Sequence, residues 1–397
     1  MSRPQSPMPS PRRVAQRPEP RVRVFWPGRL LVLVTLLVPA LATASIGTWL
    51  KGALHLGLYR ERVATLQATL PEDHGTWGLA FSPHGRYLAA SSPQTAFVQL
   101  WDWRKGRVVR RFRKIGSDIS STTALAYSPD GRYLASCHDG APHGAVQVWN
   151  VQAGAEVARL FGPHGSWDCS AITFSPHGRS LYRVTDDDGP KSTGFVAYST
   201  RTWTQRWALA TRPFIPNALA VSAQGHWAAL GGGTYTHKNE YFVQQIALVD
   251  LTHHTLVRLL KTFPAPPPRL IYGRLVPVAN EPARALAWNP RAFEVVTGQY
   301  GVDPGGSDVI RVYDLKTGAI VAHEPGPLGT GVTALRYTPQ GRYLIEAGIH
   351  HEVEIWDGSH QHLLQKIPHQ AWSLAVSSHG HYLALGEGRE IQVWRFR

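Results

Sequence analysis

The amino-acid sequence predicts an all-β protein, a seven-bladed β-propeller of four-stranded antiparallel blades, with one N-terminal transmembrane or signal helix. Three observations in the 397 residues predict it. A phrase of strand, tight turn and strand recurs seven times, and a third strand with an aromatic residue near its end usually follows. An apolar run without a charge precedes the first copy. The repeat carries the most weight, because a four-strand unit repeated in this way closes into a propeller.

The chain opens with a polar leader. Residues 1–29 are rich in Pro, Arg, Ser and Gln, and they carry seven Arg against one acid, Glu19. A segment with so few apolar residues cannot bury a core. We therefore expect residues 1–29 to be a disordered, Arg/Pro-rich cytoplasmic tail.

An apolar segment follows at residues 30–50 and contains no charged residue. A helix of this length crosses a hydrocarbon layer of about 30 Å at about 1.5 Å per residue. Because Arg crowds its N-terminal side, we expect a single-pass signal-anchor helix with a cytoplasmic N-terminus and the C-terminal domain on the far, periplasmic or extracytoplasmic side. The alternative is secretion after signal cleavage near Ala42 or Ala44, which also exports the domain. Residues 51–61 form the linker.

The repeated phrase is a short apolar strand, a turn built around Ser-Pro-x-Gly or a close variant, and a second strand. Proline presets φ for a turn, and glycine two residues later permits φ > 0. A third strand and usually a fourth follow each copy, which gives four antiparallel strands in each blade. The seven copies begin at Phe81, Tyr127, Phe174, Val221, Trp288, Tyr337 and Val376.

The seventh copy has no fourth strand, because the sequence ends at Arg397. An open blade leaves unpaired backbone groups along its edge. Residues 62–70 form a β-capable stretch ahead of blade one, and we predict that they are the closing strand of blade seven. The propeller then spans residues 62–397. A Pro-rich insertion at residues 262–282 lies between blades four and five, as a spacer or an extra contact arm.

Trp101-Asp102 and Trp356-Asp357 end two of the third strands, and Trp149-Asn150 and Tyr313-Asp314 are near variants. With these dipeptides the chain resembles the WD-repeat family over about residues 62–397. The resemblance implies a propeller whose ring is closed by an N-terminal strand. It also implies that the first strand of each blade runs from a top face to a bottom face.

Motifs for chemistry are absent from the sequence. There is no His-Glu-x-x-His and no Gly-x-Ser-x-Gly, and the Gly231–Gly233 run opens a loop rather than a helix. Formal net charge is +14, but no nucleic-acid-binding motif accompanies it. We therefore expect a non-enzymatic protein without cofactor, metal or nucleic acid, namely a membrane-anchored scaffold that binds a protein partner. The alternative is an exported propeller enzyme with its active site in the central channel.

Aromatic and acidic residues suggest where a partner binds. Tryptophan recurs at the top of first strands, beside the central channel, and acids collect in top loops. Aromatic anchors with an acidic surround suit a peptide-binding patch, whereas core packing is the alternative for the tryptophans. The candidate partner-binding residues are Trp77, Trp167, Asp168, Trp372, Asp186, Asp187 and Asp188.

Basic residues gather in the bottom turns, between strands one and two and between strands three and four. Basic groups near an anionic bilayer are worth about 1 kcal/mol each. We expect these residues to face the membrane, and ordinary solvated turns are the alternative. The candidates are Arg86, Arg104, Lys105, Arg107, Arg179 and Arg342.

The two cysteines fall on neighbouring blades. Cys137 closes the second strand of blade two and Cys169 opens the first strand of blade three, so both belong on the top rim. Two separate buried thiols are the simpler expectation. A disulfide is the alternative that an exported domain permits.

Overall fold

The protein is described from a computed structural model. The residues it describes are 62–72, 74–114, 122–138, 146–161, 169–185, 194–236, 241–261, 269–271, 274–276, 285–298, 308–325, 331–349 and 352–397. The predicted tail 1–29, apolar helix 30–50 and linker 51–61 all lie outside these ranges. Within them, no helix is both long and apolar enough to cross a bilayer.

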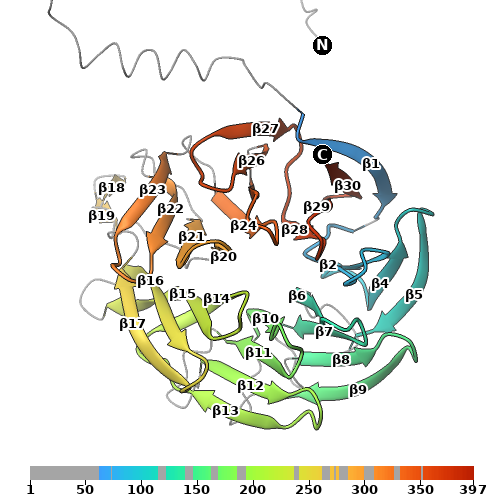
Figure 1. Cartoon of the computed structure of the whole chain (residues 1–397), viewed down its shortest axis with the longest axis horizontal. Coiled ribbons are helices and arrows are strands. Elements are labelled where there is room, and N and C mark those ends of the chain that lie inside the picture. Colours follow the sequence, from blue (N-terminus) through green and yellow to red (C-terminus); the bar gives the residue numbers. More distant parts are fainter. Residues whose placement is uncertain are drawn as a thin grey trace, which may run out of the picture. The chain divides into compact units, whose positions relative to one another are not determined.

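Seven four-stranded antiparallel sheets form a ring, which confirms the predicted seven-bladed propeller (Figure 1). Blade one holds β2 (Gly78–Phe81), β3 (Tyr87–Ser91), β4 (Phe97–Asp102) and β5 (Arg107–Arg113). Blade two holds β6 (Thr122–Tyr127), β7 (Tyr133–His138), β8 (Val146–Asn150) and β9 (Ala155–Leu160). Blade three holds β10 (Ala171–Phe174), β11 (Ser180–Val184), β12 (Phe195–Ser199) and β13 (Gln205–Leu209).

The remaining blades repeat the same order. Blade four holds β14 (Ile215–Val221), β15 (Trp227–Thr236), β16 (Tyr241–Asp250) and β17 (Thr255–Lys261). Blade five holds β20 (Ala285–Trp288), β21 (Glu294–Gly298), β22 (Asp308–Asp314) and β23 (Ile320–Pro325). Blade six holds β24 (Gly331–Tyr337), β25 (Tyr343–Ile349), β26 (Val353–Asp357) and β27 (Leu363–Ile367).

Blade seven combines both ends of the propeller. It holds β28 (Ser373–Val376), β29 (Tyr382–Glu387) and β30 (Glu390–Phe396), and its outer strand is β1 (Ala64–Pro71). β1 pairs antiparallel with β30, with Ala64 opposite Phe396 and Pro71 opposite Glu390 (Figure 1). This pairing protects the edge of β30 and joins the first strand of the ring to the last.

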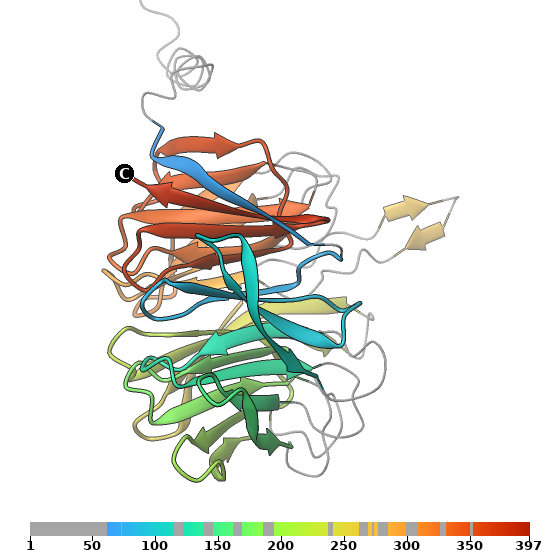
Figure 2. The same ribbon diagram turned by 90° about the vertical axis from the view of Figure 1, so that its right-hand side faces the viewer.

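The turns between first and second strands show why the phrase repeats. In blade one, the Ser82 hydroxyl accepts a hydrogen bond from the Tyr87 amide at 3.0 Å, and Gly85 has a φ of 64°. Such a φ favours glycine, because a Cβ would be strained there. Blade five is the exception, since Ala292 and Phe293 occupy its turn without a glycine. These turns and those between third and fourth strands form the bottom face, and the opposite side, seen edge-on in Figure 2, is the top face.

The core lies between the blades. Seven apolar clusters are buried, one at each junction of neighbouring blades. At the junction of blades seven and one, Leu79 and Trp101 pack with Ile391 and Val393. Each blade therefore buries both faces against its neighbours, so the interfaces between blades contribute to the stability of the ring.

The insertion adds one hairpin to the ring. β18 (Arg269–Ile271) and β19 (Arg274–Val276) pair antiparallel as a separate two-stranded sheet (Figure 2). The rest of the predicted insertion 262–282 lies outside the described residues.

Candidate partner-binding site on the top face and in the central channel

Trp77 and Trp372 form a stacked pair. Trp77 immediately precedes β2 of blade one and Trp372 immediately precedes β28 of blade seven. Their ring centroids lie 6.4 Å apart with an interplanar angle of 13°. The two side chains stay 45% and 44% exposed, so they are not core residues. The core-packing alternative is therefore wrong for these two tryptophans.

Backbone hydrogen bonds anchor each tryptophan in its own blade, and one side-chain hydrogen bond joins the two blades beside the stack. The Trp77 amide donates to the Ser91 carbonyl at 2.9 Å, and the Trp372 amide donates to the Gly386 carbonyl at 3.0 Å. The Ser373 hydroxyl donates to the Thr76 carbonyl across the blade junction at 2.9 Å. A Cβ on Gly386 would lie 2.8 Å from the Thr76 Cβ, so glycine is needed for this close approach.

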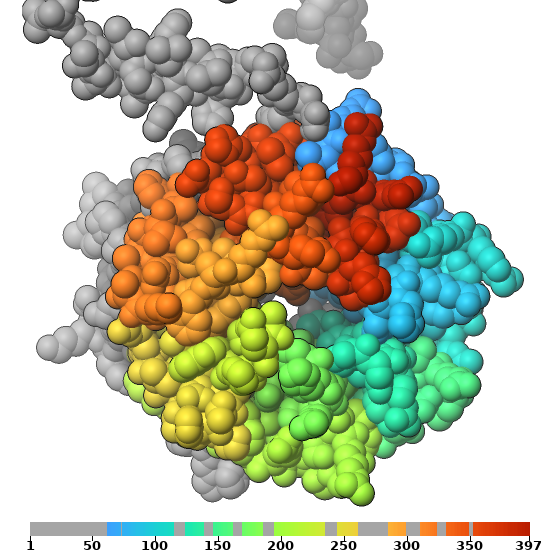
Figure 3. All heavy atoms as spheres, in the orientation of Figure 1, coloured from blue at the N-terminus to red at the C-terminus, as the bar shows by residue number. Residues whose placement is uncertain are grey.

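A central channel opens beside the stack. The described part has a volume of about 160 Å³ and is lined by the first strands of all seven blades. Figure 3 shows the ring hollowed at its centre. Six of the blades contribute an aliphatic residue to its wall, but most of the lining surface that faces the channel is polar. The aliphatic residues are Leu79, Leu125, Ile172, Leu219, Leu286 and Leu374.

Arg336 is the only charged residue among the described residues that line the channel. Sequence analysis missed it. The signal was present in the repeat, because the residue just before the start of each phrase is Ala in five copies and Thr in another, and Arg only before Tyr337. A single charged residue in one copy of a repeat usually indicates a solvent-exposed surface position, whereas the recurring tryptophans indicated a binding site.

The other predicted partner-binding residues are not placed. Trp167, Asp168, Asp186, Asp187 and Asp188 lie outside the described residues. The acidic surround of the tryptophans therefore stays a prediction.

The six predicted membrane-facing residues share the bottom face, and all are exposed. Some lie flat on aromatic rings of the same turns. The guanidinium carbon of Arg86 lies 5.0 Å from the centroid of Tyr87, and that of Arg342 lies 4.9 Å from Tyr343. Arg104 lies 4.4 Å from the ring of Trp103 and also donates to the Gly85 carbonyl at 3.2 Å. These contacts order the guanidinium groups while leaving their charge open to solvent.

Lys105, Arg107 and Arg179 belong to the same face and are likewise exposed. Lys105 lies in the turn between β4 and β5, and Arg107 begins β5. Arg179 ends the turn between β10 and β11. The face is thus basic over blades one, three and six.

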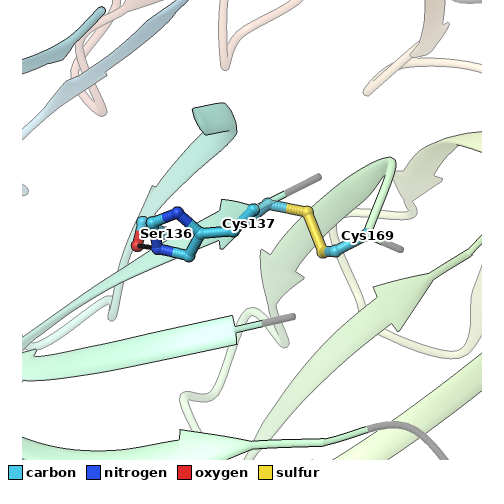
Figure 4. The surroundings of a disulfide bond; sticks show 4 residues. Ser136, Cys137 and Cys169 are labelled. Carbon is cyan, nitrogen blue, oxygen red and sulfur yellow. Dashed lines mark hydrogen bonds between the residues drawn. A yellow bond between two sulfur atoms is a disulfide. The ribbon is translucent and has the colours of Figure 1, made fainter. Parts of the chain in front are cut away.

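Cys137 and Cys169 form a disulfide between blades two and three (Figure 4). Both residues are buried, and their Cα atoms lie 5.4 Å apart, within the usual range for a disulfide. The expected pair of separate thiols is replaced by the alternative, because neighbouring blades bring these two rim positions together. Beside the bond, the Ser136 hydroxyl lies 2.6 Å from Nε2 of His138.

The described part of the chain contains no group of three or more His, Cys, Asp or Glu residues suited to hold a metal ion.

The seven-bladed ring can be compared with known families. Comparison with family models matches the WD domain, G-beta repeat, at residues 62–102 and 112–150. These segments cover β1 and the first three strands of blades one and two. Comparison with curated proteins gives no match. The chain therefore carries WD repeats in its first two blades and forms a seven-bladed ring, and WD-repeat propellers typically mediate protein interactions.

Proposed function

We propose that this protein is a membrane-anchored, non-catalytic scaffold whose propeller binds a protein partner on its top face. The Trp77–Trp372 stack is the observation that carries the proposal. Two large aromatic rings stand side by side at the mouth of the channel and remain nearly half exposed. Tryptophans in such a position are typical anchors of protein interfaces, because burying them against a partner releases much apolar surface from water.

The channel supports binding rather than catalysis. A pocket that encloses a small-molecule substrate usually measures about 300–1,000 Å³, whereas the described channel measures about 160 Å³. General acid–base chemistry needs titratable groups that converge on one point, and Arg336 is the only charged group in the described lining. A side chain of a partner fits this space better than a substrate does.

The membrane anchor rests on the sequence. The uncharged segment 30–50 and the Arg-rich leader 1–29 favour a signal anchor with a cytoplasmic N-terminus. A disulfide is compatible with this topology, because disulfides persist in oxidising compartments outside the cytosol. The bottom face, on which β1 begins, is basic and would then be turned toward the lipid surface.

Crosslinking in the native cells tests the proposed function. The full-length protein is crosslinked, recovered in mild detergent and compared with Trp77→Ala and Trp372→Ala. Val321→Ala serves as the matched control, because Val321 is 52% exposed on the outer strand of blade five. One near-stoichiometric protein, lost at least tenfold in both tryptophan variants and retained in the control, is expected. Equal recovery from all four proteins, or recovery of no protein at all, contradicts the proposal.

A further inference from the structure

Arg336 interrupts a ring of small residues. It lies on β24 one residue before Tyr337, which pairs with Leu344. The register is the same in every blade, as in blade one, where Phe81 pairs with Leu88. The six other blades place a small side chain at the position of Arg336, namely Ala80, Ala126, Thr173, Ala220, Ala287 and Ala375.

The guanidinium of Arg336 has no acidic partner among the described residues. Its one hydrogen bond there is from Nη1 to the carbonyl of Leu335, at 2.8 Å. Solvent reaches the side chain through the channel, but the blades surround it, and this desolvation lowers the pKa of Arg336 below its usual range. A guanidinium has five N–H donors, so most of them are free to bind a ligand. The guanidinium is exposed to the channel and is the only charged group in the described lining, which favours an anion as the ligand.

A carboxylate fits this environment better than a phosphate. Its single negative charge balances the single positive charge, and its two oxygens match the planar fork of the guanidinium. A phosphate carries up to two charges and needs a second cation, and no other cation lines the described channel. The volume of about 160 Å³ is close to that of a cavity which holds one benzene molecule, about 150 Å³. The site therefore suits a group the size of one side chain.

The aromatic pair lies farther toward the top face than Arg336. Thr333 holds in blade six the position that Trp77 and Trp372 hold in blades one and seven, four residues before the strand end. Arg336 follows Thr333 by three residues, or about 10 Å along a strand. A ligand that enters from the top face thus meets the indole rings first and the guanidinium below them.

We propose that the channel takes up a carboxylate from the peptide chain of the partner, which pairs with Arg336 while an adjacent apolar side chain packs on Trp77 and Trp372. This inference rests on the proposed function, because it specifies the chemistry of the partner at the same site. It predicts a partner segment in which an acidic group lies next to an apolar residue.

The first test uses benzoate and its uncharged analogue benzamide as probes. Binding to the full-length protein in mild detergent is followed by ligand-observed NMR titration. Benzoate is expected to bind at least tenfold more tightly than benzamide, because a hydrogen bond to a charged group is the stronger kind. In Arg336→Ala the two probes should bind alike, whereas Arg336→Lys should keep part of the difference. Equal binding of both probes to the natural protein, or a benzoate preference that survives in Arg336→Ala, overturns the proposal.

The second test identifies the source of the carboxylate. One pool of N-acetylated tetrapeptide amides has Glu fixed at the third position, and its control pool has Gln there. A second pair of pools carries a free or an amidated C-terminus. Displacement of benzoate by the Glu pool indicates an acidic side chain, and displacement by the free-carboxylate pool indicates a chain terminus. If no pool displaces benzoate, the ligand is a small-molecule carboxylate and the peptide proposal is wrong.

The Arg336→Ala variant is expected to fold like the natural protein. Arg336→Ala gives blade six the residue that five other blades carry at this position, so its thermal midpoint should equal or exceed that of the natural protein. Crosslinking separates this inference from the proposed function. A partner that is lost in the tryptophan variants but retained in Arg336→Ala overturns the carboxylate site and leaves the scaffold function standing.

Discussion

Two buried histidines, His360 and His138, make the stability of this propeller depend on pH. His360 is 4% exposed in the turn between β26 and β27, and its ring lies 4.6 Å from that of Trp356. Neither ring nitrogen has a hydrogen-bond partner among the described residues. Burial lowers the pKa of His360 to about 4, and burial likewise lowers the pKa of His138, beside the disulfide, to about 4. Both rings are therefore neutral in the folded protein near neutral pH.

We predict that stability falls as the pH is lowered from about 6.5 to about 4. An unfolded histidine has a pKa of about 6.5 and binds a proton first, so each buried histidine stabilises the fold above that pH and loses its contribution below it. His360→Asn removes one of the two contributions, on the order of 2 kcal/mol. Asn is suitable because the backbone of His360 has a φ of 57°, which Asn tolerates.

Denaturant unfolding at pH 7 and pH 4.5 measures this effect. The difference between the two pH values should be smaller in His360→Asn than in the natural protein. His379→Asn, an exposed turn residue of blade seven, is the control and should keep the full difference. Parallel pH curves for His360→Asn and the natural protein would show that the buried ring is not responsible.

At the scale of elements, the last residue of the third strand fixes the turn that follows it. In blade six the Asp357 carboxylate accepts hydrogen bonds from the amides of Gln361 at 2.8 Å and His362 at 3.2 Å. In blade two Asn150 accepts one from the amide of Ala153 at 2.8 Å. In blade six the Asp of the WD dipeptide thus caps a turn, and the Asn in blade two does the same.

We predict that Asp357→Ala destabilises the protein by about 1–2 kcal/mol, because it removes the acceptor of two turn amides. Asp357→Asn should retain most of the stability, since an amide oxygen stands in for the carboxylate, as in blade two. Denaturant midpoints of the two variants at pH 7 provide the measurement. Equal losses in both would mean that the charge, and not the turn hydrogen bonds, matters.

The repeat made the strands and turns predictable from the sequence, but not the contacts between residues of different blades. Proline and glycine mark each turn locally, so the seven pairs of strands could be located from the sequence. The predicted closing strand 62–70 lies close to the observed Ala64–Pro71. In contrast, the Trp77–Trp372 stack joins residues almost 300 positions apart and exists only once the ring is closed. The register that singles out Arg336 likewise needs all seven first strands aligned around one channel.

At the scale of the whole molecule, one side chain links the closing strand to a second blade. Gln365 on β27 of blade six is buried. Its side-chain oxygen accepts from the Ala64 amide at 2.8 Å, and its side-chain nitrogen donates to the Ala64 carbonyl at 3.1 Å. Gln365 therefore satisfies both backbone groups of the first residue of β1.

We predict that Gln365→Ala destabilises the protein by about 2 kcal/mol, because it leaves a buried amide and a buried carbonyl of Ala64 without partners. The loss should appear as faster hydrogen exchange in β1 and in its partner β30, while blades three and four keep their protection. Gln361→Ala, an exposed residue of the same blade, is the control. Uniform exchange changes around the ring would argue against a local role at the closure.

The disulfide links the fold to the compartment in which the propeller resides. Cys137 and Cys169 are 32 residues apart, and a crosslink over a loop of that length is worth about 3–4 kcal/mol by the chain-entropy model. The proposed export of the propeller would preserve this bond, because thiols are usually kept reduced in the cytosol. We therefore predict that the full-length protein from its native cells, denatured and treated with a maleimide polymer, shifts on a gel only after reduction.

Reduction should also lower the thermal midpoint of the protein. The double variant Cys137→Ser, Cys169→Ser should have the same lower midpoint and should show no gel shift. Two reactive thiols before reduction would place the propeller in a reducing compartment, and the proposed topology of the 30–50 anchor would then have to be reversed.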